Sequence, residues 1–220
     1  MKKNVCMFPI VAIATFVLFH SSGYAQTVLV SVTGRTHVTS SGNSTGAVSY
    51  NNYYAQQGQA NNAFVWNLSS QSPTTLLSAK IFINNTGSGI TGSGTYTIYD
   101  VNSSSATLLN SGAAFSNQTA VFSDLGGGTS YGSASYSPAN LGNFIVLDLN
   151  PAGLSALQAA WGAGFFTIGG AAVGSGFVFG GTANIPDSEV YIQAAVPEPS
   201  AFSLMVLGVG GLAMLRRRRE

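Results

Sequence analysis

Residues 77–84 read Leu-Ser-Ala-Lys-Ile-Phe-Ile-Asn, and this stretch decides the fold class. The odd-numbered positions from Leu77 to Ile83 are all apolar, whereas Ser78 and Lys80 between them are polar. A period of two places the apolar side chains on one face of a β-strand. We therefore expect a strand with one face in a core and the other in solvent.

Alternation of the same kind occurs elsewhere in the chain, in segments separated by clusters of Gly, Ser and Asn. Three further sets of apolar residues have this spacing: Phe64, Trp66 and Leu68; Ile145, Leu147 and Leu149; and Val190, Ile192 and Ala194. Many short strands of this kind favour an all-β fold. The pattern predicts one antiparallel β-sandwich, jelly-roll-like, over residues 26–196.

One segment of this domain has helical rather than strand periodicity. Asn150 is suited to cap a helix and Pro151 to occupy its first turn. Leu154, Leu157 and Trp161 then share one face, and a glycine follows at 162. We expect a single short helix near residues 151–161 that covers one end of the sandwich.

Charge is scarce and unevenly placed. Only 7% of residues are charged, and residues 26–196 contain two basic and five acidic side chains, a net charge of −3. Such a domain has no basic surface for nucleic acid. The only cysteine, Cys6, precedes residue 26, so we expect neither a disulfide nor thiolate chemistry in the domain.

The N-terminus has the three parts of a secretion signal. Lys2 and Lys3 precede an apolar stretch at residues 5–19, and small residues lead up to Ala25. This order is typical of a signal peptide. We expect an N-terminal signal helix at residues 1–25, with cleavage between Ala25 and Gln26 by the general secretory machinery.

The C-terminus also has three parts. Pro197-Glu198-Pro199 precedes a 15-residue apolar run at residues 201–215, about 22 Å long as a helix. Four consecutive arginines, Arg216, Arg217, Arg218 and Arg219, follow the run and should remain on the cytoplasmic side of a membrane. We expect a sorting tail at residues 197–220 with a transmembrane helix at 201–215. The two prolines should keep the segment between domain and membrane extended, outside any sheet or helix.

This tail resembles the PEP-CTERM sorting signal in its motif (197–199), its short apolar helix and its basic end (216–219). The resemblance implies recognition by an exosortase, a membrane-embedded cysteine transpeptidase, with cleavage near the motif. It further implies a transient stage in the inner membrane and a final location at the outer surface or in the extracellular matrix.

The domain looks like a β-rich domain that occurs in PEP-CTERM proteins and has no assigned activity. The similar stretches are residues 96–101, 122–132, 147–154 and 166–170. This resemblance bears on architecture and location, and implies no chemistry.

Catalytic patterns are weak in this domain. Gly42-Asn43-Ser44-Thr45-Gly46 and Gly128-Thr129-Ser130-Tyr131-Gly132 fit G-x-S-x-G, but a hydrolase of this type needs an acid and a histidine after the serine. His37 precedes both serines, and we expect it in a turn or at the surface. We expect no catalytic residues and no enzymatic activity. The alternative is a glycosidase pair among the carboxylates, which are Asp100, Asp124, Asp148, Asp187 and Glu189.

Two binding hypotheses remain open. Asp124, in a Gly-rich loop, is the best candidate for calcium, although we expect no cofactor and find no D-x-D-x-D-G loop. Tyr50, Tyr53, Tyr54 and Trp66 suggest stacking on sugars, but we favour packing in the core.

These observations favour a non-enzymatic exported protein of the cell surface or biofilm matrix, sorted by exosortase and associated with extracellular polysaccharide. The alternative is a carbohydrate-binding module, and a glycoside hydrolase or lyase is less favoured.

Overall fold

The computed structural model describes residues 25–44, 52–86, 88–109, 118–180 and 186–198. It is mostly β, and all its paired strands are antiparallel, as the alternation predicted. The strands are β1 (Ala25–Ser31), β2 (Gly34–Thr39), β3 (Ala55–Gln56), β4 (Ala60–Asn67), β5 (Ser78–Asn84), β6 (Gly94–Tyr99), β7 (Ser130–Tyr136), β8 (Phe144–Asp148), β9 (Phe165–Gly174), β10 (Phe177–Val178) and β11 (Val190–Pro197). The predicted signal helix and membrane helix lie outside the described residues.

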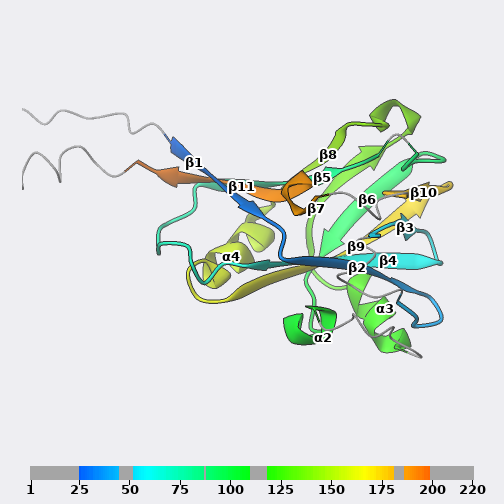
Figure 1. Ribbon diagram of the computed structural model, residues 1–220, viewed down its shortest axis with the longest axis horizontal. Coiled ribbons are helices and arrows are strands. Elements are labelled where there is room, and N and C mark those ends of the chain that lie inside the picture. The colour runs from blue at the N-terminus through cyan, green and yellow to red at the C-terminus, as the bar shows by residue number, and fades with distance from the viewer. Residues whose placement is uncertain (1–24, 45–51, 87, 110–117, 181–185, 199–220) are drawn as a thin grey trace, which may run out of the picture.

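Two sheets share one core (Figure 1). The smaller sheet has the strand order β1-β11-β5-β8. The larger, curled sheet has the order β10-β3-β4-β9-β6-β7, with β2 also paired to β4. Ile81 and Ile192 of the smaller sheet and Trp66 and Ile168 of the larger are all fully buried in the same cluster.

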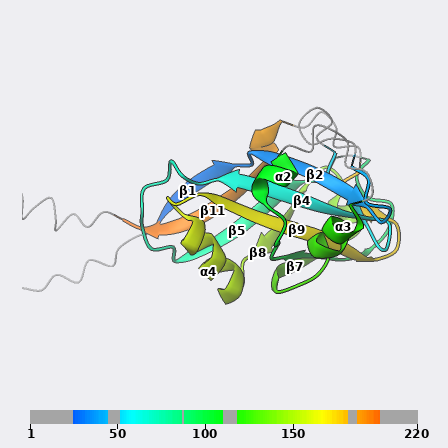
Figure 2. The same ribbon diagram turned by 90° about the horizontal axis from the view of Figure 1, so that it is seen from below.

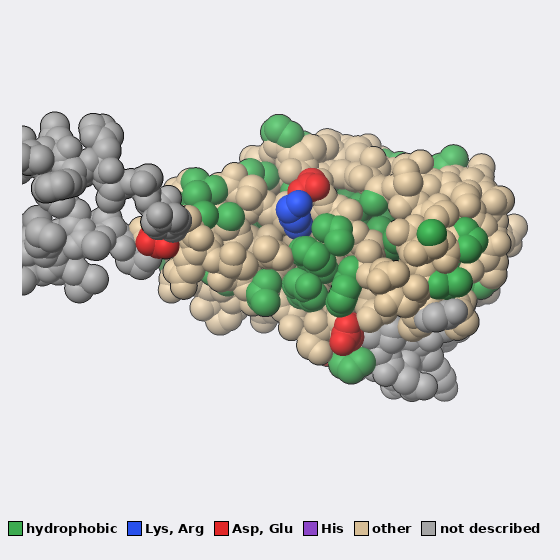
Figure 3. Space-filling model, turned by 90° about the horizontal axis from the view of Figure 1, so that it is seen from above, with side chains coloured by type: hydrophobic (Ala, Val, Ile, Leu, Met, Phe, Trp, Pro, Cys, Tyr) green, Lys and Arg blue, Asp and Glu red, His purple; other side chains and the backbone are tan. Residues whose placement is uncertain are grey.

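The smaller sheet follows the predicted alternation closely. In β5, Ala79, Ile81 and Ile83 are buried while Ser78 and Lys80 are exposed. Leu77 is an exception, because β5 begins at Ser78 and Leu77 is 53% exposed. The outer face carries an aromatic cluster of Phe82, Phe144 and Tyr191, in which Phe82 and Tyr191 stack at 4.8 Å. Figure 3 shows a group of hydrophobic side chains on one face of the molecule, beside an adjacent basic and acidic side chain.

The predicted helix is present as α4 (Pro151–Ala160). The side chain of Asn150 accepts a hydrogen bond from the backbone N–H of Gly153, and Pro151 occupies the first turn. Gly162, two residues after the end of the helix, has a φ of +73°, a backbone conformation that favours glycine. Leu157 and Trp161 enter the shared core, and Leu154 packs against it.

The prediction of a single helix is wrong. Two more helices, α2 (Ser105–Leu109) and α3 (Thr119–Leu125), lie on the outer face of the larger sheet (Figure 2). Their buried leucines, Leu108 and Leu125, form a second apolar cluster with Val38, Ala63 and Val65 of β2 and β4. α2 has five residues and α3 has seven, so neither helix exceeds two turns. Helices this short are stabilised by packing on the sheet rather than by intrinsic helix propensity.

Candidate functional site

The first and last described segments of the chain lie side by side. β1 pairs with β11 in antiparallel register, so that Ala25 is opposite Pro197 and Gln26 is opposite Val196. Val28 and Val30 of β1 and Ala194 and Val196 of β11 turn toward the core and hold this pair on the body of the domain. Figure 1 shows the two strands running together away from the larger sheet. The residues of the predicted signal cleavage point therefore directly face the start of the sorting motif.

The motif begins inside the sheet. Pro197 is the final residue of β11, so the prediction that both prolines stay out of any sheet is wrong for this residue. A proline lacks the N–H that a strand interior needs, but at a strand end this loss is tolerated. At this position β11 pairs only with β1, because its pairing with β5 ends at Ala195. Pro197 and Glu198 are exposed, whereas Pro199 and residues 200–220, with Arg216 to Arg219, lie outside the described residues.

A loop supports this end of the sheet from the side. Trp161 donates its indole N–H to the carbonyl of Ser72 at 3.2 Å. Gln158 accepts from the N–H of Leu76 at 2.6 Å and donates to the carbonyl of Thr74 at 2.8 Å. Together these bonds tie α4 to the loop that lies beside β1 and β11.

All five predicted carboxylates have structural partners. Asp148 pairs with Lys80 at 2.9 Å, and Asp187 pairs with the buried Arg35 at 3.2 Å. Glu189 accepts from the side chain of Asn84 at 2.9 Å, and Asp100 accepts from the backbone N–H of Thr129 at 2.6 Å. Each acid thus stabilises a strand or a turn.

Asp124, the calcium candidate, serves as a cap for a turn. Its carboxylate accepts from the backbone N–H groups of Asn102 and Ser103, the latter at 2.7 Å. Burial alone would raise the pKa of Asp124, but the hydrogen bonds from Ser103 and Asn102 outweigh burial and lower it. In the described part of the chain, no three His, Cys, Asp or Glu side chains gather as a metal site would need. Calcium at Asp124 stays a prediction, and its present hydrogen bonds favour a structural role.

The other predicted candidates lie apart or in the core. His37 is not in a turn or at the surface as expected: it is a buried residue of β2 that contacts the ring of Tyr54 and lies 2.8 Å from the carbonyl oxygen of Asn52. Ser44 is buried against Thr36, whereas Ser130 begins the exposed end of β7. Tyr53 and Trp66 are fully buried, which agrees with the prediction that these aromatic residues pack in the core rather than stack on sugars. Tyr50 lies outside the described residues.

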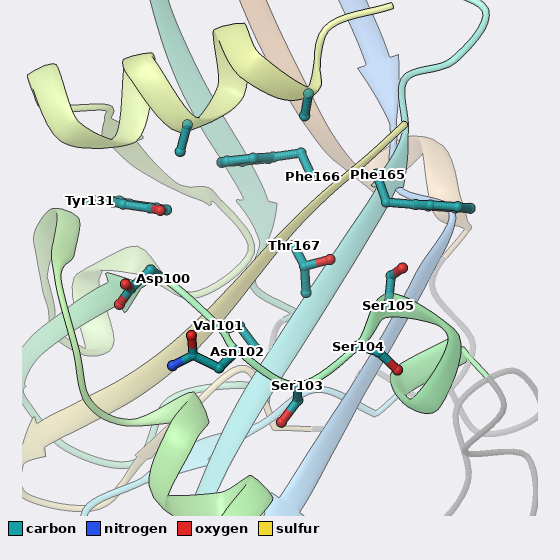
Figure 4. Close-up of a pocket in the computed structure, with 12 residues that line it drawn as sticks. Asp100, Val101, Asn102, Ser103, Ser104, Ser105, Tyr131, Phe165, Phe166 and Thr167 are labelled. Carbon is teal, nitrogen blue, oxygen red and sulfur yellow. The ribbon is translucent and has the colours of Figure 1, made fainter. Parts of the chain in front are cut away.

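A groove that the sequence patterns did not suggest lies between α4 and the segment that leads into α2. It has a volume of about 460 Å³. In Figure 4, Tyr131 lies at one end and Phe165 at the other, with Thr167 between them and Asp100 near Tyr131. The ring of Tyr131 lies parallel to that of Phe166, with centroids 6.2 Å apart. Burial and the negative charge of Asp100 raise the pKa of Tyr131, so the phenol stays protonated at neutral pH.

Sequence reasoning missed the groove because its walls come from four segments that are distant in the sequence. Asp100 directly follows β6, Tyr131 lies near the start of β7, α4 contributes Ala156 and Ala160, and Phe165 begins β9. The one local signal was the pair Phe165-Phe166. Successive side chains of a strand point to opposite faces, so one of the two rings has to lie on the outer face. Phe165 is 46% exposed.

Comparison with known proteins identifies the tail. Residues 195–219 match the family model described as the PEP-CTERM protein-sorting motif. No curated protein matches the chain. Within the described residues no helix is both long and apolar enough to cross a membrane. The chain therefore carries a PEP-CTERM sorting motif at residues 195–219, which marks it as an exosortase substrate exported to the cell surface.

Proposed function

We propose that the chain is a non-enzymatic protein of the cell surface or extracellular matrix that associates with extracellular polysaccharide after exosortase has processed it. The observation that carries this proposal is the sorting motif, which begins on the last strand of the domain. The matched residues start at Ala195, inside β11, so domain and signal follow each other with no linker between them.

The register of β1 and β11 supports processing of both ends at one place. Ala25, the last residue of the proposed signal, is opposite Pro197. A fully extended chain from Pro197 to residue 201 spans at most about 14 Å. A span at residues 201–215 would therefore hold the β1–β11 end of the domain close to the membrane. Removal of residues 1–25 and of the tail would leave a domain of about residues 26–196 whose two ends are adjacent.

The carboxylates support a non-enzymatic role. A glycosidase needs two carboxyl groups about 5–9.5 Å apart that flank a substrate. Here Asp148 and Asp187 form ion pairs with basic residues, and Asp124 is occupied as a cap. A hydrolase or lyase would have to use groups that already stabilise the fold.

We also infer that the two sheets form a jelly-roll-like sandwich. When β2 and the two-residue strands β3 and β10 are set aside, eight of the described strands remain. Numbered along the chain, they have the orders 1-8-3-6 in one sheet and 2-7-4-5 in the other. Successive strands thus cross between the sheets, except for the fourth and fifth, β6 and β7, which pair within the larger sheet, as in a double Greek key. Lectin domains are among the proteins with this fold, so a carbohydrate-binding module remains the second candidate function.

Two variants of the tail test the sorting proposal in the producing cells. Glu198→Ala should leave the membrane topology intact but block processing at the C-terminus, so that the form that retains the tail accumulates in the inner membrane. Replacing Arg216 to Arg219 with Ser should weaken arrest in the membrane, because arginine at the bilayer centre costs roughly 2.5–3.5 kcal/mol. Fractionation and immunoblotting distinguish the two forms. Normal surface display of both variants would contradict the proposal.

The polysaccharide half of the proposal needs its own experiment. Polysaccharide purified from the medium of the producing cells is immobilised and incubated with the mature protein. Retention of the protein supports association, whereas flow-through at every ionic strength contradicts it. Turnover of the polysaccharide during the incubation would instead favour the enzyme alternative.

A further inference from the structure

We propose that the groove beside α4 binds a short segment of an uncharged polysaccharide, with Phe165 as the stacking surface. This inference rests on the proposed association with polysaccharide and assigns it to a site. The groove is lined by Ala156 and Ala160 of α4, by residues 100–105 and by residues 165–167 of β9 (Figure 4). Its volume of about 460 Å³ lies within the range of roughly 300–1,000 Å³ that is typical of small-ligand sites.

Three hydroxyl groups that line the groove are free to bind a ligand. In the part of the chain that the structure describes, the hydroxyls of Ser105, Tyr131 and Thr167 make no hydrogen bond to protein groups. Asp100 uses one carboxylate oxygen for the N–H of Thr129 and keeps the other. Hydroxyls both donate and accept, and a carboxylate accepts, which is the set that the hydroxyls of a sugar require.

Phe165 gives these polar groups an apolar partner. It is 46% exposed at the first position of β9, while the adjacent Phe166 is buried in the shared core. Sugar rings have an apolar C–H face and a rim of hydroxyls. An exposed ring beside Thr167 can therefore receive the C–H face while the rim reaches the polar side chains.

The charge of the site selects among possible ligands. Among the described residues that line the groove, Asp100 is the only charged one, and residues 26–196 carry a net charge of −3. Uronic acids, sulfated glycans and nucleic acids would bring negative charge next to Asp100 without a basic partner. The lining therefore fits a neutral glycan.

The walls of the groove are held in place before a ligand arrives. Asp124 fixes the backbone of Asn102 and Ser103, and Ser104 accepts from the N–H of Thr107 at the start of α2. Asp124 thus acts as a positioning residue for the segment that forms one wall. A rigid site loses less entropy on binding, which favours affinity for a flexible polysaccharide.

The test compares two exposed apolar residues of the same strand. The full chain carrying Phe165→Ala, Thr167→Val or Val173→Ala is produced in its own cells, and the mature surface form is purified. Val173 is 59% exposed on β9 and does not line the groove, so it is the matched control. Each form is titrated against purified neutral extracellular polysaccharide and against a uronic-acid polymer, and its thermal midpoint is recorded.

We expect Phe165→Ala to weaken binding to the neutral polysaccharide about tenfold or more, a loss of about 1.4 kcal/mol or more of binding free energy, because the stacking surface is removed. Thr167→Val should weaken it severalfold, and Val173→Ala should leave it within about twofold. Binding that all three variants retain would overturn this inference but leave the proposed association intact. Preference for the acidic polymer, or absence of binding to the neutral one, would also overturn it.

Discussion

The outer faces of the two sheets differ in what covers them. On the larger sheet, α2 and α3 bury the outer side of β4, so that all residues from Ala60 to Trp66 are buried. On the smaller sheet the outer face is open, and Leu29 and Val146 are 63% and 37% exposed. The larger sheet therefore has apolar packing on both faces. The smaller sheet has it on one, and carries the two ends of the domain and the sorting motif.

Because only the larger sheet is covered on both faces, we infer that the two sheets have different roles. Burial on both faces makes the larger sheet the main source of stability and gives the groove a rigid floor in β9. The smaller sheet can present β1 and β11 to processing enzymes because nothing in the described chain has to move away from their ends. Substitutions of the same type should thus have very different effects on the two outer faces.

The largest contrast is expected for two leucines. Leu125 of α3 is fully buried on the outer face of the larger sheet, whereas Leu29 is exposed on that of the smaller. Leu125→Ala should lower the free energy of unfolding by about 2–5 kcal/mol, because a cavity is left behind. Leu29→Ala should change it by less than about 0.5 kcal/mol. Denaturant unfolding of both variants measures the contrast, and equal losses would show that α3 does not cover the sheet.

A smaller effect is expected where α3 contacts β9. A Cβ atom at Gly169 would meet the backbone of Leu125, so the close approach of helix and strand depends on glycine. Gly169→Ala should destabilise the domain by about 1–3 kcal/mol. Gly164, just before the same strand, has open space around it and serves as the control. If the thermal midpoint of Gly169→Ala matched that of Gly164→Ala, the close packing of α3 on β9 would be wrong.

The smallest effect concerns pH and the edge of the larger sheet. Burial lowers the pKa of His37 from its ordinary value near 6.5, although its bond with Asn52 acts in the opposite direction. The unfolded state therefore binds the proton more readily, and stability falls as the pH drops below about 6.5. The slope should be no more than about 1.4 kcal/mol per pH unit.

His37→Gln isolates this contribution, because His37 is the one histidine after residue 25. Unfolding free energies of both forms between pH 7.5 and 5 should converge as the pH falls. A constant difference across this range would mean that the burial of His37 does not depress its pKa.

The two sheets also differ in how well the sequence predicts them. The alternation around Ile81 and Ile192 predicts β5 and β11 because one face of each is exposed. It is a poorer guide to β4, where Asn61 and Asn62 are buried as well. α4 was predictable from Asn150, Pro151 and Gly162, whereas α3 begins without a side-chain cap at Gln118 and depends on tertiary packing.

The candidate sites also differ in how well the sequence predicts them. The sorting motif is a local pattern, so Pro197-Glu198-Pro199 could be found from the sequence alone. That Pro197 belongs to a strand could not be found, because it depends on pairing with Ala25 at the other end of the chain. The groove forms only because the fold brings Asp100, Tyr131 and Phe165 together, and no local sequence pattern indicates that these residues are close in space.

We propose that exosortase processes the chain near Pro197-Glu198-Pro199, at the end of β11. Intact-mass spectrometry of the surface form from wild-type cells, followed by sequencing of its terminal peptides, tests it most directly. We expect a chain that begins at Gln26 and lacks the run from Arg216 to Arg219. A surface form that still ends in these arginines would show that the tail is a plain membrane anchor and that exosortase does not process it.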